Sequence, residues 1–530
     1  MKKIFVTIIL ISAYSFAQPL PYNYSLEKSK ANKISATTPL SNIIEQVLVD
    51  EKGIIWLATS RGLSKSTDNG ESWINYYNTE DFGSKGIASI KYNNGIIWAG
   101  LWHGIEDLGG ETIGVGDGLR YSSDEGTTWV TIPQPIDEQN DNQIVYGINT
   151  LDALPVTVPE ENLVYDMDFT EDAIWIATKS GGLRKSTDMG QTWQRVVLPP
   201  DYLDEISPDD TLGFDLSPSS GNLGYEENLN HRVFSIKVVN DSLMFVGSAG
   251  GINKSTDGGI SWRKFNHQNQ NEAISGNFIV ELGFDKYTNT IWAASWKAVD
   301  LAEFWGVSSS SDGGETWKVF LPNSRPQDFG FKYKYSGENR VGSEVFVATE
   351  DGVFRSSNGG STWIVNPTPI DAESGLVLPT NEYRSVVTNY LSDNSTDIWL
   401  GSLSGLVKTN ETQYQFWSGD WTVYRASQEL DSEIETYAFP NPFSPDEEKI
   451  TITYSTSGKD KEVTIRIFDF GMNLVRTLIQ NATRFGANSQ QKDLWDGRDE
   501  NGSLVPNGVY FYRIDMGSDK PVFGKIMVLM

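Results

Sequence analysis

The chain of 530 residues contains no cysteine, only three histidines and far fewer cationic than anionic side chains. Without cysteine it can have no disulfide framework, no thiol nucleophile and no lipid-modified cysteine at its start. Because histidine occurs only at His103, His231 and His267, little remains for a zinc site, and we expect neither a metal nor a cofactor. The net charge of −28 repels nucleic acid, so we expect no nucleic-acid partner.

Long hydrophobic runs are also absent, apart from one near the first residue. Apolar residues from Ile4 to Ile11 follow Lys2 and Lys3 and precede a small-residue segment that ends at Ala17. This order is typical of a secretory signal peptide, which we place at residues 1–17. No later run approaches the roughly 18 apolar residues of a spanning helix, so we expect no transmembrane segment in the mature chain. The sequence therefore predicts a secreted, extracellular or cell-surface protein.

Glycine and aromatic residues are abundant and recur in a repeated pattern. An apolar strand with Trp or Phe, a Gly-containing turn and a second strand lead to a box of the form Ser-x-Asp/Asn-x-Gly-x-Ser/Thr-Trp. Six copies of the box occur, with their third positions at Asp68, Asp124, Asp188, Asp257, Asp312 and Asn358. A seventh copy is degenerate, and we take Asn410 as its box position and Trp417 as its aromatic residue. Such self-similarity indicates a repeat architecture whose units cannot bury their faces alone.

The box residues have the chemistry of a tight turn. Asp or Asn accepts backbone N–H bonds, Gly adopts positive φ, and Ser or Thr hydroxyls complete the turn. The Trp buries its ring where the next strand begins. A metal site or a catalytic acid is needed once, whereas the box occurs in nearly every repeat. We therefore interpret the six box residues as structural.

The spacing of short strands predicts an all-β protein with two domains. Each repeat holds about four strands, and closure of seven such units gives a seven-bladed β-propeller over residues 38–426. A polar segment, 18–37, precedes it, and an acidic linker, 427–436, follows it. Short alternating strands in residues 437–530 predict a small immunoglobulin-like β-sandwich.

Two resemblances are carried by these motifs. The boxes resemble the Asp-box, or bacterial neuraminidase repeat, of sialidases, sortilin-type receptors, xyloglucanases and photosystem-assembly propellers, a group that contains both enzymes and binding proteins. The segments Asn441-Pro442-Phe443, Trp495-Asp496-Gly497 and Gly508–Tyr512 resemble the immunoglobulin-like domain of the flagellar hook-capping protein and the C-terminal sorting domains of type IX secretion. The second resemblance implies delivery to a bacterial cell surface, with the export machinery as a partner.

The candidate ligand site is placed by propeller connectivity. Connections between second and third strands and between blades share one face, where the long insertions 102–118, 133–160, 198–229, 295–306 and 322–327 should lie, opposite the boxes. Aromatic and charged residues in these insertions suit a sugar ring: Trp102, His103, Glu106, Trp296, Asp300, Glu303 and Trp305. Arg232 and Arg384 stand where innermost strands begin, so they are expected at the mouth of the central channel, able to bind an anion or carboxylate. The alternative for the Trp rings is packing of the loops onto the propeller rim, and for the two arginines it is capping of strands or pairing with nearby acids.

The sequence favours a non-catalytic surface protein that binds a glycan or a protein, with no catalytic residue assigned. The Phe/Tyr-Arg-Ile-Pro segment usual in sialidases is missing, and a xyloglucanase-like enzyme would need two propellers with carboxylates across the cleft between them. A glycoside hydrolase of sialidase or xyloglucanase-like type remains the alternative, using pairs such as Glu106 with Asp300 or Glu303. An accessory role in the export machinery is the second alternative.

Overall fold

The computed structural model describes residues 34–36, 38–106, 112–216, 228–298, 302–373, 375–378, 380–426, 435–439, 441–445, 449–486, 491–517 and 519–529. This part of the chain is almost all β, and its single helix is the one-turn 3-10 helix η1 (Leu229–His231). None of its helices is long and apolar enough to cross a membrane. The predicted signal peptide, most of segment 18–37 and most of linker 427–436 lie outside the described residues.

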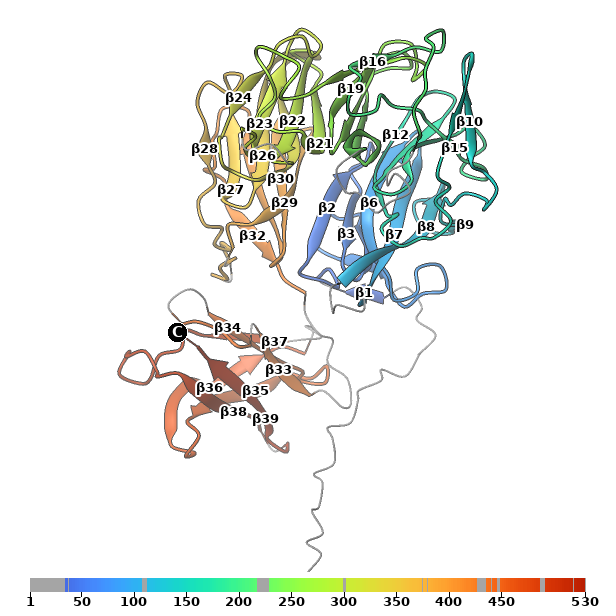
Figure 1. The fold of residues 1–530 in the computed structure, drawn as a ribbon. Coiled ribbons are helices and arrows are strands. Elements are labelled where there is room, and N and C mark those ends of the chain that lie inside the picture. Colours follow the sequence, from blue (N-terminus) through green and yellow to red (C-terminus); the bar gives the residue numbers. More distant parts are fainter. Residues whose placement is uncertain are drawn as a thin grey trace, which may run out of the picture.

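Within the described residues, seven units of four consecutive antiparallel strands follow one another, and we number them propeller sheets 1 to 7 (Figure 1). Sheets 1 and 2 contain β2 (Ile44–Val49), β3 (Ile55–Thr59), β4 (Gly62–Ser66) and β5 (Trp73–Tyr76), then β6 (Gly86–Asn93), β7 (Ile96–Glu106), β8 (Thr112–Ser122) and β9 (Val130–Ile132). Sheets 3 and 4 contain β12 (Val164–Phe169), β13 (Ile174–Thr178), β14 (Gly182–Ser186) and β15 (Gln194–Arg195), then β17 (Val233–Val238), β18 (Met244–Ser248), β19 (Gly251–Ser255) and β20 (Trp262–Phe265).

The last three sheets repeat this order. Sheet 5 contains β21 (Phe278–Asp285), β22 (Thr290–Trp296), β23 (Gly306–Ser310) and β24 (Lys318–Phe320). Sheets 6 and 7 contain β25 (Pro326–Ser336), β26 (Asn339–Thr349), β27 (Gly352–Ser356) and β28 (Ile364–Val365), then β29 (Tyr383–Tyr390), β30 (Ser395–Ser402), β31 (Leu406–Thr412) and β32 (Trp421–Tyr424). Short strands β1 (Ile34–Ala36) and β16 (Glu205–Ile206) extend sheets 1 and 4, and β10 (Gln143–Tyr146) pairs with β11 (Asn149–Asp152).

The sheets form a closed ring, which is the arrangement of a β-propeller. The innermost strands β2, β6, β12, β17, β21, β25 and β29 contact one another in that order, and β29 contacts β2. The second strand of a sheet is buried on both faces, because sheets pack face to face. This burial explains continuous apolar runs such as Ile55-Trp56-Leu57-Ala58 in place of an alternating pattern.

No strand is exchanged between the first and last sheets in the described part of the chain, so side chains close the ring. A shared apolar core holds Ile44 and Leu57 of sheet 1 against Trp399 and Leu406 of sheet 7. Hydrogen bonds also join neighbouring sheets, because polar residues on the innermost strands reach the next sheet of the ring. Six junctions are bridged in this way by Gln46, Ser89, Asp166, Ser235, Asp328 and Ser385, among the described residues.

The six boxes form the turns between third and fourth strands, on what we call the box face. In the third box, Asp188 accepts hydrogen bonds from the backbone N–H of Thr192 at 2.9 Å and from its hydroxyl at 2.6 Å. Together with the Ser186 hydroxyl, these bonds hold the pKa of Asp188 at about 2. In the first box, Gly70 has a φ of +94°, and a Cβ there would lie 2.9 Å from the Trp399 ring of the neighbouring sheet. The box thus makes a turn and also lets two sheets approach closely.

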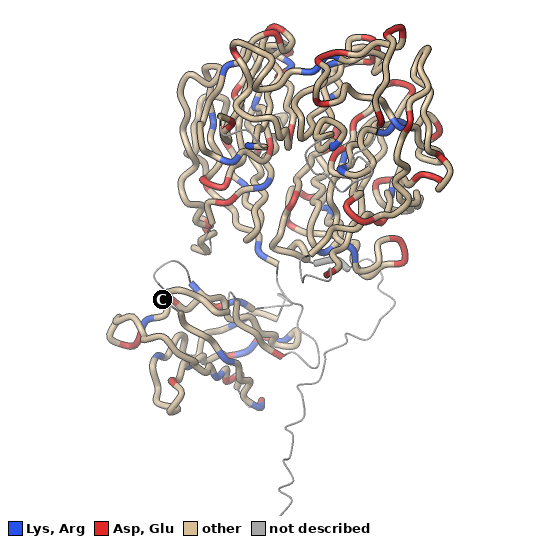
Figure 2. The backbone as a smooth tube through the Cα atoms, in the orientation of Figure 1, with Lys and Arg blue, Asp and Glu red and all other residues tan. Residues whose placement is uncertain are grey.

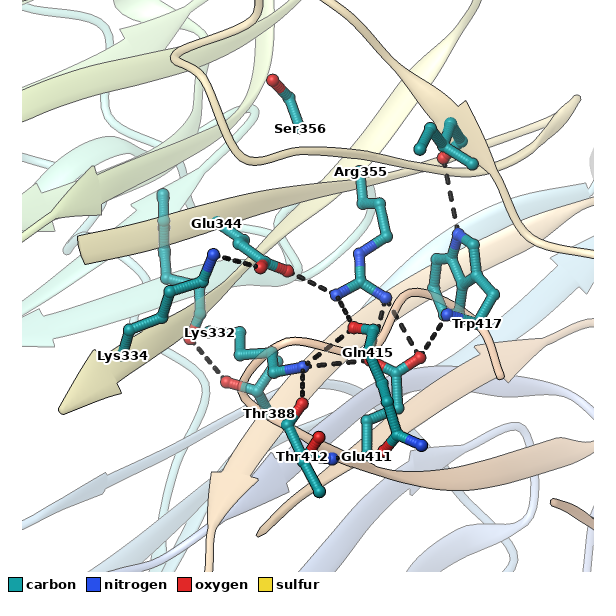
Figure 3. Close-up of polar contacts among 12 residues, drawn as sticks. Lys332, Lys334, Glu344, Arg355, Ser356, Thr388, Glu411, Thr412, Gln415 and Trp417 are labelled. Atoms are coloured by element: carbon teal, nitrogen blue, oxygen red, sulfur yellow. Dashed lines mark hydrogen bonds and ion pairs between the residues drawn. The ribbon is translucent and has the colours of Figure 1, made fainter. Parts of the chain in front are cut away.

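The predicted seventh box is not a box. Asn410 lies within β31, paired with Asp397 of β30, and its side-chain amide donates to Asp397 at 2.7 Å, so it is a strand residue and not a turn residue. In place of a box turn, a buried ion network joins sheets 6 and 7 (Figure 3). Glu411 pairs with Lys332 at 3.0 Å and with Arg355 at 2.9 Å, and all three side chains are fully buried. The repeat could not predict this network, because the pairing of these three side chains is not part of the box.

The C-terminal residues form two further sheets with one common core. One sheet has the order β33 (Thr436–Phe439), β34 (Ile450–Tyr454) and β37 (Gln491–Trp495), and the other has β36 (Leu474–Arg484), β35 (Lys461–Phe468), β38 (Gly508–Met516) and β39 (Val522–Val528). Trp495 of the first sheet packs in this core with Ile465 and Tyr512 of the second. Alternating burial along β38 matches its alternating sequence, because only one face of the strand meets the core.

Candidate functional site

Each innermost strand of the propeller carries a β-bulge near its first residue. At the bulge, one residue has no partner across the ladder, so its side chain leaves the alternating pattern of the strand. These residues are Glu45, Ala88, Tyr165, Phe234, Val280, Gln327 and Arg384. All seven line one cavity of about 820 Å³, which we call the channel-mouth cavity. Every sheet of the ring therefore contributes one bulge residue to the same site.

An aromatic arc forms one side of this cavity. The ring of Tyr165 lies 5.2 Å from Phe234, Phe234 lies 4.5 Å from Phe278, and Phe278 stacks on Trp296 at 6.0 Å. The indole N–H of Trp296 donates to the carbonyl of Pro326 at 2.8 Å, which fixes the ring. Four aromatic rings from sheets 3 to 5 thus stand in series, and such flat surfaces suit the C–H faces of sugar rings.

Charged residues complete the lining. Lys179, Arg232, Lys297 and Arg384 are the cations, and Glu45 is the carboxylate among the described residues that line the cavity. Arg384 bonds Gln327 at 3.2 Å and lies 3.4 Å from Glu382. Burial raises the pKa of Glu45, and the charge of Arg384 opposes that rise. A carboxyl group whose pKa is raised by burial is the type of group that acts as a general acid.

Three residues expected at the ligand site line this cavity: Arg232, Arg384 and Trp296. Tyr165, Phe234, Phe278 and Glu45 were missed by the sequence analysis. For Glu45, Tyr165 and Phe234, the signal that could have found them is a triplet at the start of most innermost strands: an apolar residue, then any residue, then Gln, Ser, Asp or Glu. The middle residue of that triplet is the one displaced by the bulge.

Two other candidate residues of the fifth-sheet insertion, Glu303 and Trp305, are absent from the described lining of the channel-mouth cavity. Glu303 is 4% exposed and accepts hydrogen bonds from the backbone N–H groups of Asn277 at 3.1 Å and Ala298 at 2.8 Å. It therefore fixes the loop and is not the exposed acid that the sequence suggested. Trp305 is 39% exposed and lies near the Arg325 guanidinium, outside the cavity lining. Asp300 lies outside the described residues.

The second-sheet insertion is a strand extension and not the expected loop. β7 and β8 remain paired from Trp102–Gly116 to Glu106–Thr112. Half-buried Trp102 packs on Gly86, and His103 contacts Asp117, which pairs with Lys85 at 2.8 Å. Glu106 is exposed at the end of β7. Trp102, His103 and Glu106 are absent from the described lining of the channel-mouth cavity.

The positions of the two longest insertions, 133–160 and 198–229, also differ from the sequence prediction. The sequence predicts them on the face opposite the boxes, yet the Tyr146 hydroxyl donates at 2.8 Å to the carbonyl of Ile260, inside the fourth box. Ile148 donates to the carbonyl of Pro208 at 3.0 Å, which ties the two insertions together. Their apolar residues cover the core between sheets 3 and 4, because Leu151 and Leu216 pack with Trp175 and Trp262 there. In their described residues, these insertions pack along the side of the propeller.

A second cavity, of about 450 Å³, lies among the box turns of sheets 5 and 6. Its hydroxyl groups are largely engaged, since Thr288 and Ser343 both donate to Asp285. Trp292 at its floor is 3% exposed, so its ring offers no face for stacking. Among the described residues, no group of three or more His, Asp or Glu side chains is arranged to hold a metal ion. The channel-mouth cavity is therefore the better candidate site.

No family model matches the chain. The xyloglucanase Xgh74A of Acetivibrio thermocellus is 25% identical over 254 residues, which cover 47% of this chain and 23% of that protein. The chain thus spans about a quarter of the length of the curated relatives it matches. Among solved structures, an ancestral GH74 enzyme has a TM-score of 0.50 at 13% identity, with 93% of this chain and 63% of that chain covered. YCF48 from Cyanidioschyzon merolae has a TM-score of 0.39 at 14% identity, with 72% and 99% covered.

The similarity to the ancestral GH74 structure supports the β-propeller fold, and the relatives in sequence change the order of the functional hypotheses. The relatives in sequence are named xyloglucanases. They therefore favour the alternative, an extracellular glycoside hydrolase, over the non-catalytic binder that the sequence analysis preferred.

Proposed function

We propose that the protein is an extracellular glycoside hydrolase that takes a polysaccharide at the channel-mouth cavity. The observation that carries the proposal is that one cavity contains both the aromatic arc from Tyr165 to Trp296 and a half-buried carboxyl group, Glu45. Stacking would hold successive sugar rings, and Glu45, with its raised pKa, would protonate the leaving oxygen. The xyloglucanase relatives support the reaction class.

Glycoside hydrolysis ordinarily needs a second carboxylate, as base or nucleophile. We assign this role to Glu382, which lies 3.4 Å from Arg384, the same guanidinium that acts on Glu45. Arg384 pairs with Glu382, whereas burial raises the pKa of Glu45, which gives the two carboxyl groups different environments for the two roles.

The test is hydrolysis of xyloglucan and of other β-glucans, followed by reducing-end release. Glu45→Gln and Glu382→Gln should each lower kcat at least 100-fold while oligosaccharide binding persists. Glu315→Gln is the matched control, because Glu315 is an exposed carboxylate paired with Arg263 on the box face. Turnover that survives both substitutions would remove the assignment of these residues, and absence of turnover on every glycan would remove the hydrolase proposal.

A glycan-binding protein without catalysis is the second candidate. It is favoured by one observation: Glu45 is the one carboxylate among the described residues that line the cavity, whereas glycosidases place two at the bond they cleave. Affinity electrophoresis in gels that contain xyloglucan separates the candidates. Retarded migration without reducing-end release would favour binding alone.

We further propose that the propeller has seven blades and that residues 437–530 are an immunoglobulin-like sorting domain. The cyclic contacts of the innermost strands support the first, and two sheets around one core support the second. On this proposal a signal peptide and the sorting domain deliver the protein outside the cell through a type IX-like machinery.

A further inference from the structure

The channel-mouth cavity has the opposite charge balance from the chain as a whole. The chain has 70 acidic residues against 42 Lys and Arg, and acidic residues occur throughout the propeller (Figure 2). The cavity lining instead contains four cations, Lys179, Arg232, Lys297 and Arg384, and one carboxylate, Glu45, among the described residues. Glu161 and Glu382 pair with Lys179 and Arg384 from outside this lining, and the cations still outnumber the three carboxylates. In an anionic protein, such a local excess of cations concentrates anions at that position.

The cations accompany the aromatic arc along its length. Lys179 belongs to sheet 3, as does Tyr165, and Lys297 directly follows Trp296 of sheet 5. Arg232 stands two residues before Phe234, in the middle of the arc, and is only 8% exposed. A ligand whose rings stack on the arc would therefore meet cationic groups at both ends and at the centre.

Two of these cations, Lys179 and Arg232, repel each other across the cavity lining. Burial lowers the pKa of Lys179, and the neighbouring charge of Arg232 lowers it further. Lys179 pairs with Glu161, which offsets part of that repulsion. The Nε group of Arg384 is buried and has no hydrogen-bond partner among the described residues. A carboxylate ligand would relieve the repulsion and supply the acceptors that a guanidinium binds best.

We infer that the glycan held by the channel-mouth cavity is acidic, a polysaccharide that carries uronate carboxylates along its chain. This inference rests on the proposed glycan-binding function and adds the chemical class of the ligand. A neutral glucan would pair with none of the cations. A peptide C-terminus would bring one carboxylate to a cavity whose cations come from four sheets.

The experiment measures binding by calorimetry of the full chain at low salt with two matched pairs of probes. One pair is hexagalacturonate and its methyl ester, which differ in charge while keeping the same sugar backbone. The other is xylotetraose with and without a glucuronosyl branch. At least one acidic probe should bind about tenfold more tightly than its neutral partner, and this preference should fall as NaCl is added.

Variants then assign the preference to the cavity. Arg384→Gln and Lys297→Gln should each reduce the acid preference, measured as the ratio of the affinities for the acidic and the neutral probe, several-fold. Lys297 is exposed, so its variant is expected to fold normally. Arg263→Gln is the matched control, because that arginine is exposed on the box face and paired with Glu315. An unchanged preference in both cavity variants would overturn the inference.

The remaining outcomes separate this inference from the function on which it rests. Equal binding of acidic and neutral probes, or binding of a xyloglucan oligosaccharide but of no acidic probe, would overturn the inference and leave the proposed function standing. Failure of every glycan to bind would overturn both. Capture of a peptide through its C-terminal carboxylate, with no glycan bound, would likewise overturn both.

Discussion

The backbone N–H of Val47 donates a 3.0 Å hydrogen bond to the hydroxyl of Ser385, which lies 338 positions further along the chain. The same hydroxyl donates to Asp328 at 2.7 Å. One buried serine therefore joins sheet 7 to sheet 1 and also to sheet 6. Because no strand is exchanged at the closure among the described residues, this polar link and the core around Trp399 hold the ring together.

Replacement of Ser385 by alanine should destabilise the propeller. The variant leaves the N–H of Val47 buried without an acceptor, at a cost of about 1–3 kcal/mol in the free energy of unfolding. Urea unfolding followed by tryptophan fluorescence measures the change. Ser357→Ala is the control, since Ser357 is exposed, and it should unfold like the parent. Equal stability of both variants would mean that the closure does not depend on this bond.

The box carboxylates should make stability depend on acid. Hydroxyl and backbone hydrogen bonds from Thr192 hold the pKa of Asp188 at about 2, whereas an unfolded aspartate titrates near 3.9. A depressed pKa stabilises the fold above the unfolded value, and that contribution disappears as the pH falls from about 4 to 2. Asp188→Ala should lower the melting temperature by a few degrees at pH 7, with a smaller difference from the parent at pH 2.

The chain provides its own control for this prediction. Asn358 makes the corresponding bonds in the sixth box, where its side-chain carbonyl accepts from the N–H of Thr362 at 3.0 Å. Asp188→Asn should therefore fold like the parent and lose no stability through its own titration between pH 4 and 2. Thermal unfolding of both variants across this range checks the claim. If Asp188→Asn were as unstable as Asp188→Ala, charge and not turn geometry would account for the box.

The fold could be anticipated because its signals are local. A box of eight residues contains the main donors and acceptors of its own turn, so Asp188 with Ser186 and Thr192 identifies the turn wherever it occurs. The fully buried second strands add continuous apolar runs. The exception is the seventh unit, where Glu411 and Arg355 replace the box through contacts between sheets, which no local pattern records.

The site was harder to predict because a bulge is a property of strand pairing. The displaced residue is Tyr165 in one strand, Ala88 in another and Arg384 in a third, so no shared side chain identifies it. Whether a polar side chain in a loop is exposed is equally hard to predict from the amino-acid composition of that loop. Glu303 stands in a polar loop, yet its carboxylate turns inward to the N–H of Asn277. Such a contact satisfies buried donors and depends on the folded loop.

The ion network between sheets 6 and 7 should be sensitive to the loss of one charge. Glu411 faces both Lys332 and Arg355 in a fully buried position, so Glu411→Gln removes the carboxylate that pairs with Lys332 and leaves Arg355 to share Glu344 with Lys334. Removal of one member of a buried pair typically costs about 3–5 kcal/mol. Urea unfolding should show a loss of this size, whereas Glu315→Gln, which removes an exposed pair, should change little. A loss below about 1 kcal/mol would show that the network is not required for stability.

The proposed sorting role of residues 437–530 predicts a separation of folding from export. Deletion of this segment should leave a folded propeller, because the core of the C-terminal sheets contains only residues of that segment. The shortened protein should accumulate within the cell envelope of a type IX-competent host. Fractionation and surface labelling measure its location, and circular dichroism checks its fold. Normal surface display of the shortened chain would rule out the sorting role.

The aromatic arc should carry the sugar-binding energy of the cavity. Tyr165 is 37% exposed at one end of the arc, and its ring meets Phe234 at 5.2 Å, so its removal opens the stacking surface without emptying the core. An aromatic ring covered by a ligand contributes roughly 1–2 kcal/mol, so Tyr165→Ala should weaken oligosaccharide binding about tenfold. Tyr165→Phe keeps the ring and should bind like the parent, which separates stacking from any role of the hydroxyl. Tyr202→Ala is the surface control, because Tyr202 is 70% exposed and absent from the cavity lining. If Tyr165→Ala bound as tightly as the parent, the ligand would have to lie elsewhere, and the cavity would no longer be the candidate site.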